Sequence, residues 1–121
     1  MKQAVVIDLG GTAIKSALCD LRGKLTNRRE RPTPRTAPAR DFLAAIAEEI
    51  EAHLQSPLVV SPSNHGRSSF DKLRTSGRVY GIGLGTPGLA DPKGRIVGGC
   101  PNLPQWAGAD AGAWLKKRFR L

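Results

Sequence analysis

A short apolar strand that ends in a carboxylate and two glycines dictates how this chain can begin to fold. Residues 5–7 (Val-Val-Ile) favour a buried strand because β-branched side chains pack well in sheets, and the run is too short for an independent helix. Asp8 follows directly, and Gly10 and Gly11 come two residues later. Glycine lets the backbone take a positive φ and bring its N–H groups close to an oxyanion. This stretch therefore predicts a strand that delivers a carboxylate to an anion-binding turn.

The side chains around the two glycines suit the phosphates of a nucleotide and their metal ion. Thr12 offers a hydroxyl donor, and Lys15 offers a mobile positive charge. Asp8 has two acceptor oxygens, which suit Mg²⁺ or a water bound to it. The same residues are compatible with a plain Gly-Gly hairpin turn beside an ordinary salt bridge. We predict a phosphate-and-metal loop, with the simple turn as the alternative.

Two better-known glycine loops do not fit the spacing. The sequence has no P-loop pattern, and Ile14 stands where the dinucleotide-binding fingerprint needs its third glycine. Residues 13–19 continue instead into a turn at 20–23 and a weakly alternating run at 24–29. This order predicts an antiparallel meander with the phosphate loop in its first hairpin. A short helix over 13–19 is the alternative.

Length and cysteine usage indicate one cytoplasmic domain. A chain of 121 residues can bury a real core, and no apolar run approaches the ~18–20 residues of a membrane span. The first strand follows Met1 and Lys2 without a signal-peptide pattern. Cys19 and Cys100 lie far apart in the sequence, and no spacing pattern indicates a disulfide. Reduced thiols are the expectation for a cytosolic protein, with a disulfide between the two as the alternative.

The net charge of +9 raises the question of nucleic-acid binding. The cations interleave with proline and small polar residues, and only 5% of the residues are aromatic, so a stacking platform for single strands is not expected. No helix-turn-helix or zinc-finger spacing accompanies them. We expect mostly solvated surface, part of which attracts polyanions such as a nucleotide. The basic residues form three clusters: Arg22, Lys24, Arg28, Arg29, Arg31, Arg35 and Arg40; Arg67, Lys72, Arg74 and Arg78; and Lys116, Lys117, Arg118 and Arg120.

An amphipathic helix is predicted over residues 41–54, with Asp41 as its N-cap. Its apolar residues recur at steps of four and should cover one face of the sheet, while its glutamates, Glu49 among them, face elsewhere. His53 near the end of the helix is expected to be a helix-end residue rather than a ligand. The apolar stripe comprises Phe42, Ile46, Ile50 and Leu54.

The second half of the chain alternates irregular stretches with short elements. Residues 56–77 are polar, rich in Gly and Ser and without period, which indicates an insertion. A glycine-rich strand at 79–84 leads to a Thr-Pro-Gly turn, and a short strand follows at 95–97. Asp110 is expected to cap a last helix over 111–119.

Two further polar positions have competing explanations. Asn102 lies in an irregular loop and can both donate and accept hydrogen bonds, which suits sugar hydroxyls, but an asparagine that stabilises a turn is equally expected. Asp91 precedes a proline in a turn, so a structural role explains it better than a role as a catalytic base.

Two segments of the chain resemble the ROK family (repressors, uncharacterised frames and sugar kinases) of the actin/hexokinase-like ATPase superfamily. The first reads IDLGGTAIK from Ile7 to Lys15, and the second, from Gly81 to Trp106, contains GIGLGTPGLAD and PNLPQW. The resemblance covers most of the chain except about residues 56–77. It implies an α/β fold, namely an incomplete N-terminal lobe of an actin/hexokinase-like (ribonuclease H-like) ATPase. Such a lobe has a mixed sheet with an antiparallel meander and flanking helices.

The same resemblance implies transfer of the γ-phosphoryl group of ATP to a hydroxyl of glucose or a related hexose, with ATP and Mg²⁺ as cofactors. By motif position Asp8 would serve Mg²⁺, directly or through water, while the Gly88 turn and Asn102 would reach the sugar. Four residues would line the phosphates: Gly10, Gly11, Thr12 and Lys15.

Other expectations from the resemblance concern what the chain does not carry. The family's catalytic base, the Asp of an Asn-Asp pair, is expected beyond Leu121, so the chain alone is expected to be inactive. Only seven residues precede Asp8, so the DNA-binding module of the family's repressors is not expected. A homodimer is a further expectation for the full-length family. The alternatives are a non-catalytic sugar-binding or regulatory module of the ROK type and a non-functional fragment.

Overall fold

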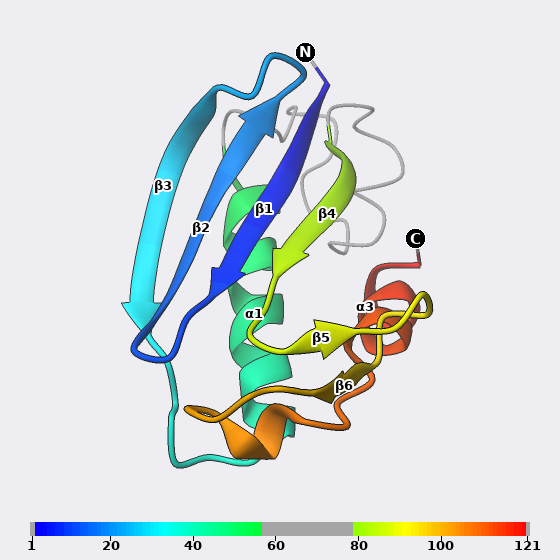
Figure 1. Ribbon diagram of the computed structural model, residues 1–121. Helices are drawn as coiled ribbons and strands as arrows, with labels where there is room; N and C mark the ends of the chain where they lie inside the picture. Colours follow the sequence, from blue (N-terminus) through cyan, green and yellow to red (C-terminus); the bar gives the residue numbers. More distant parts are fainter. Residues whose placement is uncertain (1, 57–78, 121) are drawn as a thin grey trace.

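The computed structural model describes residues 2–56 and 79–120. In these residues four long strands form one sheet, a small two-stranded sheet follows, and two α-helices lie beside them (Figure 1). The insertion predicted at 56–77 lies outside the described residues, except for Ser56. The elements in chain order are β1 (Gln3–Leu9), β2 (Ala13–Asp20), β3 (Leu25–Pro32), α1 (Ala39–Leu54), β4 (Val79–Gly85), β5 (Leu89–Ala90), β6 (Ile96–Gly98), the short 3₁₀ helix η2 (Pro104–Trp106) and α3 (Ala111–Phe119).

The large sheet has the strand order β3-β2-β1-β4. β1 pairs antiparallel with β2, and β2 pairs antiparallel with β3, so the predicted meander is confirmed. β4 pairs in parallel with the other side of β1, where Asp8 lies opposite Gly85. Parallel neighbours need a crossover connection, and α1 lies within it. The third strand extends to Pro32, beyond its predicted end at residue 29.

The core lies between the sheet and α1, which is seen behind the strands in Figure 1. Val5, Ile7 and Leu9 of β1 are buried, as the two-residue alternation of a strand requires. The ring of Phe42 also meets Trp106 of η2, with the ring centroids 5.8 Å apart. The predicted apolar stripe of α1 is fully buried and comprises Phe42, Ile46, Ile50 and Leu54. Burial of this stripe holds the helix against the sheet.

The start of α1 differs from the prediction. The helix begins at Ala39 with Pro38 at the N-cap position, so Asp41 is not the cap. Pro38 is extended, with φ −70° and ψ 163°, and its carbonyl already accepts the N–H of Asp41 at 2.9 Å. Asp41 therefore lies in the first turn, where its negative charge still interacts favourably with the helix dipole.

Glu49 also departs from the prediction, because its side chain is buried rather than turned to solvent. It is only 3% exposed. Arg29 Nε donates a hydrogen bond to Glu49 Oε2 at 2.7 Å, and Ser16 Oγ donates to the same oxygen at 3.3 Å. A buried carboxylate is tolerated when it is paired and hydrogen-bonded. The partners come from β2 and β3, so the helical period of α1 alone could not reveal them.

The last helix has the predicted bounds, 111–119, but not the predicted cap. Asp110 stands at the N-cap position, yet its side chain makes no capping hydrogen bond. Asp110 Oδ2 instead accepts from Arg95 Nη2 at 2.9 Å, which joins the residue before β6 to the start of α3. At the other side, Arg118 Nη2 donates to Glu51 Oε1 at 2.8 Å and links α3 to α1.

The hairpin between β1 and β2 requires a glycine for space and not for a positive φ. Neither Gly10 nor Gly11 has a positive φ, so that part of the prediction is wrong. The N–H of Gly10 donates to the carbonyl of Ala13 at 2.9 Å, which closes the turn. A Cβ atom on Gly10 would lie 2.8 Å from that same carbonyl oxygen, closer than real Cβ contacts. The tightness of the turn therefore selects glycine at position 10.

Replacing Phe42 by alanine should lower the free energy of unfolding by about 3–5 kcal/mol, because the fully buried ring leaves a cavity beside Trp106. Urea unfolding followed by circular dichroism measures this loss. Leu89→Ala is the control, since the Leu89 side chain is 70% exposed and its loss should change stability by less than ~0.5 kcal/mol. Similar losses in the two variants would contradict the described core.

Replacing Gly10 by alanine should lower the free energy of unfolding by more than ~1 kcal/mol, because the new Cβ meets the Ala13 carbonyl. Gly81→Ala is a matched control in β4, where an added Cβ meets no described heavy atom within 4 Å. That variant should be neutral or slightly more stable, by ~0.4–1 kcal/mol. The same urea experiment compares them, and an unperturbed Gly10 variant would refute the tight turn.

Candidate functional site

The predicted carboxylate and lysine lie next to each other on the sheet face turned away from α1. Asp8 of β1 stands opposite Lys15 of β2 in the strand register, and both are exposed. Their chain neighbours Leu9 and Ile14 are buried, so alternation along the strands turns both charged side chains outward. A groove of about 580 Å³ opens on this face. Its lining comes from β1, β2 and β3 and includes Val6, Asp8, Lys15, Ala17, Arg28 and Glu30.

The tip of the first hairpin is fastened by Thr33, a residue that the sequence analysis did not single out. Thr33 Oγ1 donates to the carbonyl of Gly10 at 2.7 Å, and its N–H donates to the carbonyl of Thr12 at 3.0 Å. Thr33 is buried, in the connection between β3 and α1. Its position between two prolines in the sequence gave no sign of this role. The two bonds orient both sides of the glycine turn.

Asn102 lies against the hairpin although ninety residues separate them in the chain. A Cβ atom placed on Gly11 would lie 3.6 Å from Asn102 Cβ. The loop that carries Asn102 is held by Gln105, whose Nε2 donates to the carbonyls of Arg35 and Ala37 at 2.6 and 2.8 Å. The structure therefore brings together the predicted phosphate loop and the predicted sugar-contacting asparagine. Asn102 itself is exposed.

Gly88 has a structural requirement of its own. Its φ is +82°, and a Cβ atom there would lie 2.2 Å from the carbonyl oxygen of Gly98 and 2.5 Å from Cys100 Sγ. The turn after β4 therefore packs directly on the strand β6 and the residues after it. Trp106 Nε1 donates to Thr86 Oγ1, which fixes the start of the same turn against η2. These contacts explain the threonine and the glycine of the Thr-Pro-Gly sequence without any ligand.

The candidate site offers a metal ion one carboxylate, that of Asp8, rather than a full set of protein ligands. Within residues 2–56 and 79–120 no three His, Cys, Asp or Glu side chains are grouped as ligands for a metal. Mg²⁺ commonly keeps several waters and binds one or two carboxylates together with substrate phosphates. The exposed Asp8 at the end of β1 fits that coordination, beside a lysine that can meet the phosphates.

The other carboxylate considered at the sequence level, Asp91, has the structural role that was predicted. Its Oδ1 accepts the backbone N–H groups of Lys93 and Arg95, both at 2.9 Å. The hydrogen bond from the Arg95 N–H is the main cause that lowers the pKa of Asp91 below its ordinary value. A carboxyl with a lowered pKa that is occupied in a turn is poorly suited to act as a general base.

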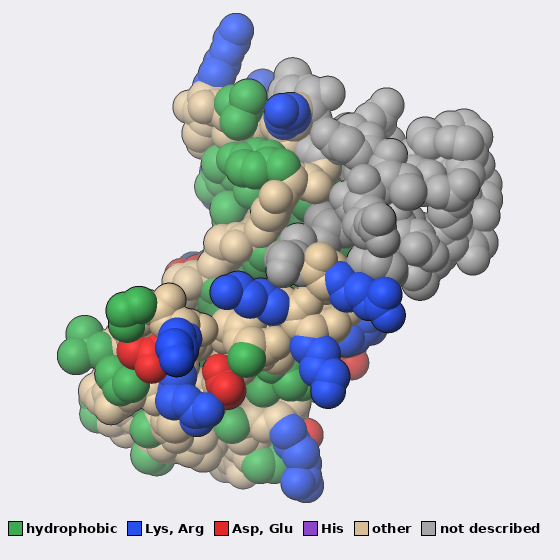
Figure 2. Space-filling view, turned by 90° about the vertical axis from the view of Figure 1, so that its right-hand side faces the viewer, with side chains coloured by type: hydrophobic (Ala, Val, Ile, Leu, Met, Phe, Trp, Pro, Cys, Tyr) green, Lys and Arg blue, Asp and Glu red, His purple; other side chains and the backbone are tan. Residues whose placement is uncertain are grey.

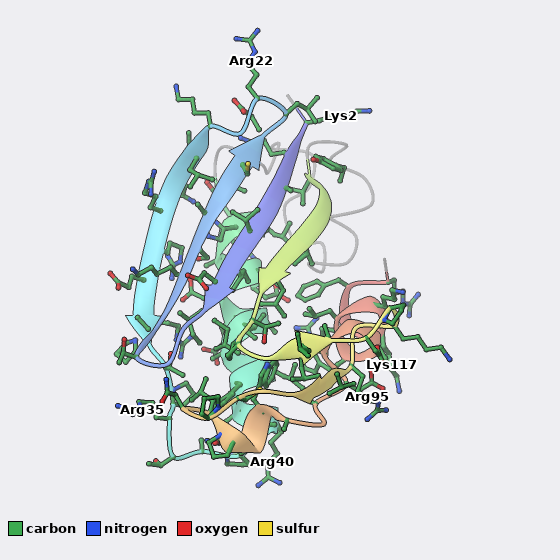
Figure 3. All side chains as sticks on the ribbon, in the orientation of Figure 1. Lys2, Arg22, Arg35, Arg40, Arg95 and Lys117 are labelled. Carbon is green, nitrogen blue, oxygen red and sulfur yellow. The ribbon has the colours of Figure 1, made fainter. Side chains whose placement is uncertain are left out.

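The basic side chains of residues 2–56 and 79–120 are spread over the surface and do not line one track. The cluster of Arg67, Lys72, Arg74 and Arg78 lies outside the described residues. Figure 3 shows Lys2 and Arg22 at one end of the sheet, and Arg35 and Arg40 near the opposite end. Figure 2 shows a further gathering of Lys and Arg side chains on the face that carries α3, where Lys116–Arg118 are exposed. This dispersion agrees with a solvated basic surface. No helix in the described residues is long and apolar enough to cross a membrane.

Comparison with known proteins links the sequence to sugar kinases. No protein-family model matches the chain. A stretch of 60 residues, 47% of the chain, is 42% identical to N-acetylmannosamine kinase of Shigella boydii and covers 21% of that protein. The corresponding enzyme of Escherichia coli K12 is 40% identical over a stretch of the same length.

Solved structures of the same fold cover nearly the whole chain. A ROK hexokinase from Thermus thermophilus superposes with a TM-score of 0.67 at 28% identity, over 98% of this chain and 32% of its own. A ROK family glucokinase from Streptomyces griseus, in complex with glucose and AMPPNP, gives 0.68 at 20% identity, over 98% and 31%. A ROK family transcriptional regulator, a homologue of the E. coli MLC protein, gives 0.70 at 21% identity, over 98% and 26%.

The chain thus spans about a third of the two kinases of known structure. Its mixed sheet and helices match the N-terminal lobe of ROK sugar kinases. The sequence likeness to N-acetylmannosamine kinases is independent of that superposition. In fold the chain is thus similar to kinases of the ROK family, and over part of its sequence it is similar to N-acetylmannosamine kinases.

Proposed function

We propose that residues 1–121 form the phosphate-binding lobe of an ATP-dependent sugar kinase that phosphorylates glucose or a related hexose. The observation that carries this proposal is the meeting of Gly11 and Asn102, which puts the glycine hairpin beside the loop expected to reach the sugar. Asp8 and Lys15 stand on the same hairpin. A kinase of this kind must hold a phosphate chain, a metal ion and a hydroxyl group close together.

Each residue of the hairpin has a distinct part in this proposal. Lys15 neutralises charge on the phosphates, and the hydroxyl of Thr12 donates to a phosphate oxygen. The N–H of Gly10 is occupied by the Ala13 carbonyl, so Gly10 contributes a close backbone approach rather than a donor. Asp8 would hold Mg²⁺ directly or through water. Bound MgATP supplies the phosphoryl group, and the rigid hairpin, fastened by Thr33, keeps the cationic and donor groups in place.

The acceptor site is proposed on the other side of Gly11. Asn102 would exchange hydrogen bonds with hydroxyls of the hexose. The turn at Gly88, which packs on Gly98 and Cys100, would shape the loop that leads to Asn102. The names of the relatives support glucose and N-acetylmannosamine as the sugars to test first. The carboxylate of Asp91 accepts hydrogen bonds in a turn, and that of Asp110 pairs with Arg95. We therefore propose that the base that deprotonates the attacking sugar hydroxyl comes from outside residues 1–121.

A non-catalytic sugar-binding or regulatory module is the second candidate. It is favoured by the equally good superposition on a transcriptional regulator, because the lobe alone does not distinguish a kinase from a regulator. The two candidates differ at the phosphate loop. A kinase lobe should bind MgATP through Lys15, whereas a sugar-binding module needs no such affinity.

Replacing Lys15 by methionine should weaken the binding of MgATP to the 121-residue chain about tenfold or more, because a charge-assisted hydrogen bond to phosphate contributes ~1.5–3 kcal/mol. Titration calorimetry measures the affinity. Lys24→Met is the matched control, since it removes the same charge from an exposed lysine at the next turn of the meander, between β2 and β3. The control should bind MgATP like the original chain.

Two further titrations separate metal and sugar contributions. Asp8→Asn should reduce the gain in ATP affinity that Mg²⁺ provides. Asn102→Ala should weaken the binding of glucose or N-acetylmannosamine and leave the affinity for MgATP unchanged. Binding of sugar without any MgATP affinity would favour the regulatory module. Equal MgATP affinity of the Lys15 and Lys24 variants would refute the assignment of the phosphate site.

A further inference from the structure

Three buried polar side chains of β2 and α1 meet two exposed polar side chains of β3. At their centre is His53, which is 0% exposed. His53 Nε2 lies 2.8 Å from Ser16 Oγ, and His53 Nδ1 lies 3.3 Å from Asn27 Nδ2. We call this group the His53 cluster; its members are Ser16, Asn27, Arg29, Glu49 and His53. It explains a histidine that the sequence pattern placed merely at a helix end.

The hydrogen bonds of the cluster have a defined direction when His53 is neutral. The amide nitrogen of Asn27 can only donate, so His53 Nδ1 accepts and the ring proton is on Nε2. His53 then donates to Ser16 Oγ, and the Ser16 hydroxyl donates to Glu49 Oε2. The same carboxylate oxygen accepts from Arg29 Nε. A second ring proton on Nδ1 would point at the Asn27 amide hydrogens and break this order.

A β-bulge brings Asn27 into the cluster. The pairing of β2 with β3 shifts register between Ser16 and Leu18, and Asn27 has a φ of +53°. Asparagine tolerates this left-handed conformation better than most residues. Most side chains of β3 are exposed, Asn27 and Arg29 among them. The cluster therefore attaches β3 to α1, together with the ion pairs that Arg31 makes with Glu48 and Glu49.

The charges that face His53 oppose its protonation on balance. Burial is the largest cause that lowers the pKa of His53 below its ordinary value of 6.5, and the positive charge of Arg29 on β3 lowers it further. Glu49 on α1 acts in the opposite direction. Arg31 lies at the edge of the group, with its Nη1 3.8 Å from Glu49 Oε1, and β2 contributes the uncharged Ser16.

We propose that the His53 cluster is a pH-sensitive latch, which holds the β2–β3 hairpin on α1 while His53 is neutral and releases β3 when His53 takes up a proton. Ser16 follows Lys15 directly in β2. Release therefore also loosens the strand that carries the proposed phosphate-binding lysine. This second consequence rests on the proposed function, whereas the latch itself does not.

Hydrogen exchange at the β3 amides tests the latch. In the released form His53 has an ordinary pKa near 6.5, so below that pH the released form binds a proton that the closed form still excludes. Protection of β3 should be constant above pH 6.5 and should fall by up to about tenfold per pH unit below it, until the lowered pKa of the closed form is reached. Amides of β1 and β4, corrected for intrinsic exchange, should not follow this course.

Two variants make the test specific. His53→Gln removes the titrating ring, so protection of β3 should lose its dependence on pH between 5 and 7. Asn27→Asp places a carboxylate beside His53 Nδ1. This carboxylate accepts a hydrogen bond from Nδ1 when the ring is protonated, so the closed form should keep the protection of the β3 amides at low pH. The latch is overturned if β3 in the original chain shows no loss below pH 6.5, or if both variants repeat its pH course.

The consequence for the phosphate site has a separate readout. MgATP affinity of the original chain should weaken on going from pH 7 to pH 5.5 more than that of the Asn27→Asp variant. Absence of MgATP affinity at every pH, together with the expected exchange behaviour, would refute the phosphate site and leave the latch intact. Weakening of the same size in both chains would show that the latch does not reach Lys15.

Discussion

The arrangement depends on the burial of one side of β1 against α1. Val5, Ile7 and Leu9 face the helix, and this fixes the opposite side of the strand as the one that presents Asp8. A shift of the pairing register of β1 by one residue would exchange its two faces and bury the carboxylate of Asp8. Because β1 is flanked by β2 and β4, the same packing sets the position of the glycine hairpin and of the turn after β4. The hydrophobic contact between strand and helix thus positions the polar chemistry on the far face.

Contacts from distant parts of the chain then complete the site. Thr33, in the connection after β3, fastens the hairpin through two backbone carbonyls. Gln105 fastens the Asn102 loop to the same connection through the carbonyls of Arg35 and Ala37. The connection between β3 and α1 therefore serves as a common anchor for both halves of the candidate site. Its prolines limit the conformations of the backbone that holds these carbonyls.

The sequence predicted those parts of the structure that depend on local pattern. Strand alternation and turn residues were sufficient for the meander, and the four-residue period was sufficient for α1. The bounds of α3 were also predicted, although the cap on which that prediction relied does not form. Two failures were local, namely the positive φ expected at the glycine turn and the cap of α1, whereas the others depended on partners far away in the chain. The burial of Glu49 depends on its hydrogen bond with Arg29. The side chain of Asp110 pairs with Arg95 instead of capping α3. Thr33 holds the glycine turn only because the first hairpin lies beside it. The family resemblance assigned Gly11 to the phosphates and Asn102 to the sugar, but their contact is seen only in the structure, since no local pattern relates the two residues.

The parallel pairing of β1 with β4 also has consequences for how the chain folds and varies. It joins residues 3–8 to residues 79–85, so the candidate site assembles only after a long stretch of chain has been closed into a loop. Contacts of such sequence separation slow folding, but the entropy of loop closure grows only with the logarithm of length. Doubling the length of a flexible loop costs only ~0.6 kcal/mol, less than the ~0.8 kcal/mol gained by burying one methylene group. The strand register, and with it the geometry around Asp8, therefore depends far more on what β1 and β4 bury than on the length of chain between them.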